Sequence, residues 1–461
     1  MQPVAFQDRL AGLELAIYAA PAFSLAALSV PLYLYLPTIY ADDFGLGLAE
    51  VGAVLLVARL ADALTDPVAG LLADRWPRRK PWLLLSLGPM AMAIWALFAP
   101  SGPVSAASLL GWSLLLYLGW TGFSVPYLAW GADLNQAYHG RTRVAGAREA
   151  AVLAGTLVAA ATPALLGLSG PAALRFLGIV ILVGLIPTVL LACARLPEPR
   201  PVAPPPLAPK QAWALLRNNA PFRRLLGAYG LNGIANGLPA TLFLSFISDR
   251  IGAPTLAGPA LALYFCAGLA GVPGWSWLSR RLGKHRAWRF GLLGACCAFL
   301  PAPFLGAGDT AGFLLLCLAT GLMVGADLVL PPAMQADVIE ADSHAGGGAR
   351  AGLYFALWGM ATKASLALAV GLAFPLLDWA GYVPGTPNAP ETWTLALLYG
   401  AAPLLFKLAA WGLMRGYALD EAALAALRPP PGDLTCPAAG FSPPPPPSSL
   451  APSLCSQDAA R

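Results

Sequence analysis

Long uncharged stretches alternate with short polar or basic stretches along most of the chain. Leu15–Ala41 and Pro81–Ala132 contain no Asp, Glu, Lys or Arg. Because a helix needs about 20 apolar residues to cross a bilayer, Pro81–Ala132 is long enough for two crossings. Backbone polar groups in lipid must be bonded within the chain, and the stretches lack strand-like alternation. We therefore expect membrane-spanning helices and not a β-barrel.

The pattern predicts twelve spans and hence an all-α membrane protein. We place the spans near residues 12–39, 46–73, 81–100, 105–133, 147–170, 173–194, 222–248, 254–279, 286–307, 310–340, 349–378 and 392–416. The predicted organisation is a six-helix bundle at 1–195, a proline-rich cytoplasmic linker at 196–221, a second six-helix bundle at 222–420 and a proline-rich, disordered cytoplasmic tail at 421–461.

The composition excludes several classes of protein. Apolar residues make up 58% of the chain and charged residues 11%, whereas a soluble domain carries about 25% charged residues. A soluble enzyme and a nucleic-acid-binding protein are therefore excluded. The chain shows neither a nucleophile–base set nor a phosphate-cradling loop, so we expect no enzymatic activity and no cofactor. The partners that we expect are a small-molecule substrate and membrane lipid, bound by a monomer.

Basic residues mark one end of the predicted helices. They gather in alternate loops at 75–80, 141–143, 195–224 and 280–286, on the same side as both termini. The net charge of +5 is spread over these loops, as expected for residues that set membrane orientation. This bias predicts a multi-pass protein of the plasma membrane, the inner membrane of a bacterium, with cytoplasmic N- and C-termini.

The second predicted span carries the most informative polar residues. Asp62 and Asp66 are spaced i, i+4, so both carboxylates share one helix face, with Arg59 one turn earlier. Two adjacent carboxylates repel unless a Na⁺ ion or a proton joins them. Arg59 offsets one negative charge, and the Thr65 hydroxyl adds an oxygen ligand suited to a hard cation. A structural ion pair between Arg59 and Asp62 is the alternative.

Further ionisable residues lie within or near the spans. Lys363 needs an anionic partner, and the Asp62–Asp66 pair of the other bundle is the natural one. Arg148 begins the fifth span and either faces the central cavity or snorkels to the interface. Asp327 lies mid-span without an evident partner. Three more residues are expected near the cytoplasmic interface: Asp337, Glu340 and Lys407.

Similar loops follow the second and the eighth span. Gly70 permits close helix approach, and Asp74 either pairs with an arginine or caps a neighbouring helix. The basic residues that follow contact anionic lipid; those of the two loops are Arg75, Arg78, Arg280 and Arg281. The repetition indicates two related bundles that rock around a site between them, and we assign these loop residues to conformational gating.

Several segments together resemble a known family. The matching segments are Arg59–Gly70, Asn219–Arg224, Ala336–Glu340, Arg350–Gly352, Lys363 and Gly381–Pro384. They resemble the major facilitator superfamily and, within it, the melibiose-permease-like glycoside–pentoside–hexuronide:cation symporters.

The resemblance implies that Asp62 and Asp66 bind the coupling cation, which is Na⁺, Li⁺ or H⁺, and that Thr121 adds a ligand. It also implies that Arg148 and Lys363 line the central cavity.

The chain departs from the sugar-binding members at three positions. Ala26 and Ser124 stand where those members carry aspartates, and Leu128 stands where an aromatic residue stacks on the sugar. Three other side chains are left to form a less polar substrate pocket: Trp120, Ser124 and Tyr127.

These observations predict a secondary active symporter that couples Na⁺ or H⁺ to a glycoside-like or other small organic solute by alternating access. Ala26 and Leu128 favour an alternative, a proton-coupled exporter or a lipid transporter. A second alternative is a non-transporting membrane scaffold or sensor that uses the proline-rich tail.

Overall fold

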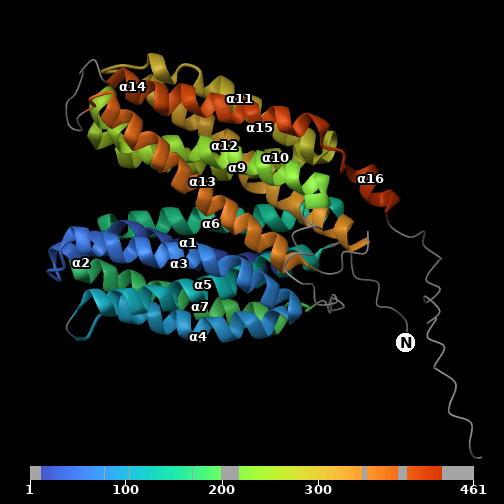
Figure 1. Ribbon diagram of the computed structural model, residues 1–461, viewed down its shortest axis with the longest axis horizontal. Helices are drawn as coiled ribbons and strands as arrows, with labels where there is room; N and C mark the ends of the chain where they lie inside the picture. The colour runs from blue at the N-terminus through green and yellow to red at the C-terminus, as the bar shows by residue number, and fades with distance from the viewer. Residues whose placement is uncertain are drawn as a thin grey trace, which may run out of the picture.

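The computed structural model describes residues 12–198, 217–344, 350–382 and 392–427, except Pro77, Pro103, Gln136 and Ser169. Within these ranges every regular element is a helix (Figure 1). Most of the linker expected at 196–221 and most of the tail expected at 421–461 lie outside the described residues.

The first half of the chain, which we call the N-half, forms a layer of long helices (Figure 1). These are α1 (Gly12–Val30), continued by a π-helical turn at Pro31–Tyr35 and by α2 (Leu36–Asp42), then α3 (Leu48–Arg75), α4 (Arg79–Phe98), α5 (Ala106–Leu134), α6 (Tyr138–Leu165) and α7 (Gly170–Arg195).

The second half, which we call the C-half, repeats this arrangement beside the first. It contains α9 (Ala220–Ser245) with a π-helical turn at Phe246–Arg250, α10 (Ala257–Leu282), α11 (Lys284–Phe299), α12 (Thr310–Asp342), α13 (Ala351–Trp379), α14 (Thr392–Ala396), a π-helical turn at Leu397–Ala401, α15 (Ala402–Leu413) and the short α16 (Glu421–Ala426).

The helices have the length and composition of membrane spans. In the described part of the chain, 11 helical stretches are long and apolar enough to cross a bilayer. α3, with 28 residues, is not among them, because it carries Arg59, Asp62 and Asp66. Outward-facing apolar side chains such as Leu85 (71% exposed) and Val183 (67%) require lipid around the bundle. The predicted all-α membrane fold is confirmed.

Two predicted boundaries were wrong. The fifth span was expected at 147–170, but α6 begins at Tyr138, because Arg141 is buried against acidic side chains of α12 and the helix extends past the apolar stretch. Arg148 therefore lies well inside α6. Residues 421–426, expected in the disordered tail, form α16, because the Asp420 side chain accepts a hydrogen bond of 2.9 Å from the Ala423 N–H and caps the helix.

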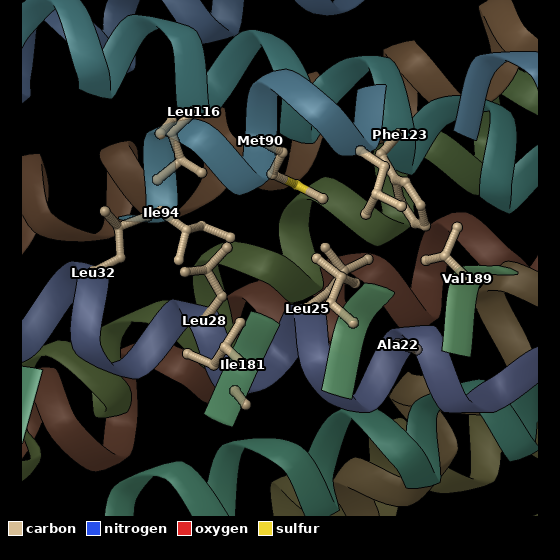
Figure 2. Close-up of a cluster of buried hydrophobic side chains, with 14 of the residues drawn as sticks. Ala22, Leu25, Leu28, Leu32, Met90, Ile94, Leu116, Phe123, Ile181 and Val189 are labelled. Carbon is tan, nitrogen blue, oxygen red and sulfur yellow. The ribbon is translucent and has the colours of Figure 1, made fainter. Parts of the chain in front are cut away.

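Apolar side chains from several helices fill the interior of the N-half. Leu28 of α1, Ile94 of α4 and Leu116 of α5 are fully buried, and Ile181 of α7 packs with them (Figure 2). A second cluster around Phe246 and Leu395 occupies the C-half. Each half therefore has its own packed interior, and a third cluster joins Ala129 and Tyr138 of the N-half to apolar residues of the C-half.

The two halves approach each other where α13 begins (Figure 1). At this α3–α13 crossing, a Cβ atom on Gly70 would stand 2.6 Å from the Ala356 Cβ and 2.7 Å from the Gly352 carbonyl oxygen. Only glycine fits at such a distance, in agreement with the close approach predicted for Gly70. We call this end of the molecule, which also carries the loops at 75–80 and 280–286, the basic end.

Candidate functional site

The acid pair, Asp62 and Asp66, lies buried between the two halves. Their exposed fractions are 8% and 3%, and both carboxylates face α13. Lys363 of α13 places its Nζ 2.6 Å from Oδ2 of Asp62 and 2.8 Å from Oδ2 of Asp66. The lysine thus pairs with the acids across the halves, as its charge predicts.

Thr121 of α5 completes this arrangement. Its Oγ1 atom lies 2.9 Å from Oδ1 of Asp62 and 2.9 Å from Oδ1 of Asp66. A hydroxyl carries one hydrogen, so it makes either one full hydrogen bond or two weaker, shared ones to these oxygens. A proton on one carboxylate or a metal cation between the oxygens makes both contacts favourable.

The charges of this group do not balance. Two ionised carboxylates and the Lys363 ammonium leave one negative charge in a buried place. An uncompensated buried charge costs several kcal/mol, so one further positive charge stabilises the site. The residues present fit either a proton on one carboxylate or a small, hard cation such as Na⁺, for which carboxylate and hydroxyl oxygens are suitable ligands.

Two residues predicted beside the acid pair are placed elsewhere. Arg59 lies on the exposed face of α3, with its guanidinium 4.2 Å from the centroid of the Tyr33 ring, and forms no ion pair with Asp62. The alternative of an Arg59–Asp62 pair was therefore wrong. The Thr65 hydroxyl donates to the carbonyl oxygen of Asp62 at 2.9 Å along its own helix. Of the two threonines, Thr121 is the one that contacts both carboxylates.

A cavity of about 300 Å³ lies between the halves next to the acid pair. Six of the predicted residues line it: Asp66, Trp120, Thr121, Ser124, Arg148 and Lys363. Further lining residues that were not predicted to face it include Glu149, Tyr229, Asp327, Phe355, Trp358 and Thr362. We call this space the central cavity.

Tyr127 was predicted to line the pocket and does not. It is 2% exposed, stacks on Tyr18 with a centroid distance of 4.9 Å and donates its hydroxyl hydrogen to the Tyr18 carbonyl oxygen. Leu128, one residue later, faces the central cavity instead. The helical register of α5 therefore turns Tyr127 into the N-half.

Charged side chains of both signs lie in the cavity wall. Arg148 of α6 is paired with its sequence neighbour Glu149, which also lines the cavity. Of the two positions left open for Arg148, the cavity wall is the one observed. The sequence feature that could have revealed Glu149 is its position immediately before the uncharged stretch 150–174.

The opposite wall contains an unexpected polar cluster, which we call the Asp327 cluster. Asp327 accepts hydrogen bonds from Trp288 Nε1 at 2.8 Å and from Asn236 Nδ2 at 3.1 Å, and Lys407 Nζ lies 3.3 Å from it. Lys407 also donates to the side-chain oxygens of Asn232 and Asn236, at 2.7 and 2.8 Å.

Two expectations change with this cluster. Lys407 is 1% exposed inside the C-half and does not lie at an interface, and it is the partner that the sequence did not reveal for Asp327. Pro331 and Pro332, one turn later in α12, lack N–H groups. The carbonyl oxygens of Asp327 and Leu328 therefore have no helical donor, and both residues line the central cavity.

The halves are joined at the basic end. The Asp74 carboxylate accepts the backbone N–H groups of Gly352 at 2.6 Å and Leu353 at 2.8 Å, at the beginning of α13. Arg79 Nη1 lies 4.0 Å from this carboxylate. Both functions proposed for Asp74, helix capping and arginine pairing, are thus observed.

The arginines that were predicted to take part in gating are exposed, whereas a neighbouring arginine, Arg79, is buried. Arg79 has an exposed fraction of 0%, whereas four predicted residues are exposed: Arg75, Arg78, Arg280 and Arg281. Arg281 lies over the ring of Trp277, 5.3 Å from its centroid. Arg79 therefore supports, from within the N-half, the Asp74 carboxylate that contacts α13, and the sequence did not single it out among its basic neighbours.

A second ionic contact joins the halves nearby. Arg141 of α6 pairs with Asp337 of α12 at 3.0 Å and with Glu340, and Lys284 Nζ lies 2.6 Å from Asp337. Asp337 is 2% exposed. Asp337 and Glu340, expected near the cytoplasmic interface, are therefore part of an ionic contact between the halves at the basic end, and Asp337 is buried in it.

A sequence model of the family described as MFS/sugar transport protein matches residues 17–421. The human sodium-dependent lysophosphatidylcholine symporter 1 is 25% identical over 430 residues, which cover 82% of this chain and 78% of that protein. The glucuronide carrier protein homolog of Escherichia coli is 23% identical, with 78% and 81% covered.

Solved structures support the fold. A bacterial homologue of the iron transporter ferroportin in an outward-facing state superposes with a TM-score of 0.67 at 17% identity, covering 87% of this chain and 98% of that chain. The Escherichia coli fucose:proton symporter superposes with a TM-score of 0.63 at 15% identity, covering 86% and 97%. At these identities the likeness concerns the fold alone.

Proposed function

The chain belongs to the MFS/sugar transport family and is a membrane transporter, and on this premise we propose that it is a cation-coupled symporter. In this proposal one Na⁺, Li⁺ or H⁺ binds at Asp62 and Asp66 and drives uptake of an organic solute through the central cavity. The contact of Thr121 with both carboxylates is the observation that carries the proposal.

Coupling follows from the position of Lys363. The acid pair belongs to α3 of the N-half and Lys363 to α13 of the C-half, so the attraction between them acts across the cavity. A bound cation weakens the hold of the acids on Lys363 and frees the ammonium for the solute. Because such coupling is reciprocal, the solute strengthens cation binding by the same factor. The halves then rock around the shared site.

The lining of the central cavity supports an amphipathic solute with a polar head. Trp358 and Tyr229 stack with a centroid distance of 3.8 Å, and Trp120 and Phe355 add further aromatic surface. Arg148 of the N-half, paired with Glu149, lines the same cavity and can act as an anion-binding group. Aromatic surface suits an acyl chain or a ring, and the charged groups suit a headgroup.

The Asp327 cluster supplies hydrogen-bond acceptors for that headgroup. The N-half lacks the acidic residues of sugar-binding relatives, with Ala26 and Ser124 at those positions. On the opposite wall, the carboxylate of Asp327 and the two carbonyl oxygens freed by Pro331 and Pro332 are available to a hydroxyl or ammonium group. In this proposal the acceptors for the head come from the C-half, opposite Arg148.

Two relatives suggest probes for this proposal. One is named as a lysophosphatidylcholine symporter and one as a glucuronide carrier homolog. The apolar residues Ala26 and Leu128, at positions where sugar-binding members carry an acid and an aromatic residue, favour the former class, a lysophospholipid, over a sugar derivative. In this reading the transporter is a monomer in a plasma membrane with cytoplasmic termini at the basic end, and the solute moves inward with the cation.

Thermal unfolding of the purified chain in detergent tests the proposal. We expect lysophosphatidylcholine to raise the unfolding temperature, with a shift that grows with Na⁺ concentration or with falling pH. The Asp62→Asn/Asp66→Asn variant should lose this cation dependence, and Arg59→Gln on the same helix should keep it. Equal shifts with and without a cation at every pH, or equal shifts in the variant, would overturn the proposal.

A further inference from the structure

A cluster of arginines surrounds one tryptophan at the basic end of the C-half, away from the central cavity. The guanidinium of Arg415 lies 4.0 Å from the centroid of the Trp411 ring, and that of Arg289 lies 4.7 Å from it. Arg224 of α9 packs against Gly416, directly after Arg415. Two segments that are distant in sequence thus place two guanidinium groups over one indole ring, and the guanidinium of Arg224 lies beside Gly416. We call this the Trp411 cluster.

The positive charge of the Trp411 cluster is not neutralised by the protein. Among the described residues, no carboxylate forms an ion pair with Arg224, Arg289 or Arg415. The carboxylates of the adjoining segment are engaged elsewhere, since Asp420 caps α16 and Glu421 lies 3.4 Å from His139. Stacking on an indole uses the faces of the guanidinium groups and leaves N–H donors at their edges.

The cluster lies where a membrane meets water. The last membrane-spanning stretch is Thr392–Gly416, so Trp411 is near its end. On the preceding turns of α15, Leu405 is 71% exposed and Leu408 45%, and Phe290 beside Arg289 is 57% exposed. Apolar side chains therefore face hydrocarbon directly below the guanidinium groups, and tryptophan is enriched at this depth.

We propose that the Trp411 cluster binds the phosphate of an anionic phospholipid in the leaflet at the basic end. Arginine presents a planar fork of donors that matches phosphate oxygens, and it remains charged at any physiological pH. The acyl chains of the same lipid would lie along Leu405 and Leu408. Basic residues at a membrane surface attract anionic lipids, and here the stacked indole fixes two of them in place.

Native mass spectrometry of the full chain in detergent tests this site. Phosphatidylglycerol and phosphatidylcholine are titrated separately at equal concentrations. We expect the wild-type chain to retain phosphatidylglycerol at about tenfold lower concentration, and the Arg289→Gln/Arg415→Gln variant to lose this preference. Phosphatidylcholine retention should not change. Equal retention of the two lipids by the wild type overturns the proposal.

A matched control distinguishes a specific lipid-binding site from general attraction to the positive charge of the basic end. Arg143→Gln/Arg217→Gln removes two exposed arginines from the same end of the molecule and should keep the preference for phosphatidylglycerol. An equal loss in this control overturns the site. If the glutamine variant does not fold, Arg289→Lys/Arg415→Lys replaces it. Lysine keeps the charge but neither stacks nor binds phosphate in a fork, so a reduced preference supports the site and an unchanged one contradicts it.

This inference does not depend on the proposed transport function. The cluster residues do not line the central cavity, and lipid retention is measured without a transported solute. Loss of the Trp411 site and loss of cation coupling are therefore separate results.

Discussion

Lys363 and Asp62 lie 2.6 Å apart although they belong to different halves of the protein. The lysine also contacts Asp66, and the three charges leave one negative charge to be balanced. The proposed cation site is therefore shared by both halves, and its occupancy should affect how they hold together.

Replacement of Lys363 by methionine should destabilise the protein. The two buried carboxylates would lose their partner; because Lys363 is 35% exposed, we expect a cost below the about 3–5 kcal/mol of a fully buried pair. Adding Asp62→Asn should recover part of this loss, because one of the repelling charges is removed. Chemical unfolding of the single and double variants measures the coupling, expected at about 0.5–3 kcal/mol. A coupling of zero would show that the 2.6 Å contact does not contribute.

Thr121→Val should weaken cation binding while leaving the fold intact. Valine has the shape of threonine but no oxygen, so it removes one ligand from between the two carboxylates. We expect cation affinity to fall about tenfold, as for the loss of one hydrogen bond to a charged group. The Na⁺ and pH dependence of thermal unfolding checks this, with Thr65→Val as the control that should behave like the wild type.

Variants of the Asp327 cluster test the proposed solute recognition independently of cation binding. Asp327→Asn/Lys407→Met removes both buried charges together and should fold better than Lys407→Met alone, which leaves an unpaired carboxylate. In the double variant we expect the lysophosphatidylcholine shift to shrink and the shift caused by the cation alone to persist. Loss of both shifts would mean that Asp327 stabilises the C-half in general and does not recognise the solute.

Asp74→Ala should shift the protein toward a state that is open at the basic end. The variant loses two hydrogen bonds to the beginning of α13, each worth about 1.5–3 kcal/mol for a charged acceptor. Spin labels at the end of α3 and at the beginning of α13 would report the change as a larger population of long distances between the two labels. An unchanged distance distribution would mean that the Arg141–Asp337 contact alone keeps this end closed.

Local patterns predicted much of the site. The i, i+4 spacing of Asp62 and Asp66 fixes a shared helix face wherever the helix lies, and Lys363 is an isolated charge that needed an acid. Gly70 and Asp74 follow in the same helix, and their expected contacts with a neighbour are observed. These predictions depend on the regular geometry of a single helix, which the spacing of residues in the sequence determines.

Contacts between helices could not be predicted in the same way. Asp327 and Lys407 meet only because α12 and α15 approach α9, and nothing in either helix alone indicates this. A difference of one residue in helical register decided that Leu128 and not Tyr127 faces the cavity, and that Arg79 and not Arg78 meets Asp74. Such choices depend on how the helices rotate in the packed bundle.

Direct measurement of cation binding tests the central claim most closely. Radioactive Na⁺ binding and proton uptake are measured on the purified chain, for the wild type and for Asp62→Asn/Asp66→Asn, with Arg59→Gln as the control. The structure predicts one cation, Na⁺ or H⁺, bound per wild-type and per control chain, and none at this site in the double variant. An unchanged stoichiometry in the double variant would contradict a cation site at Asp62 and Asp66.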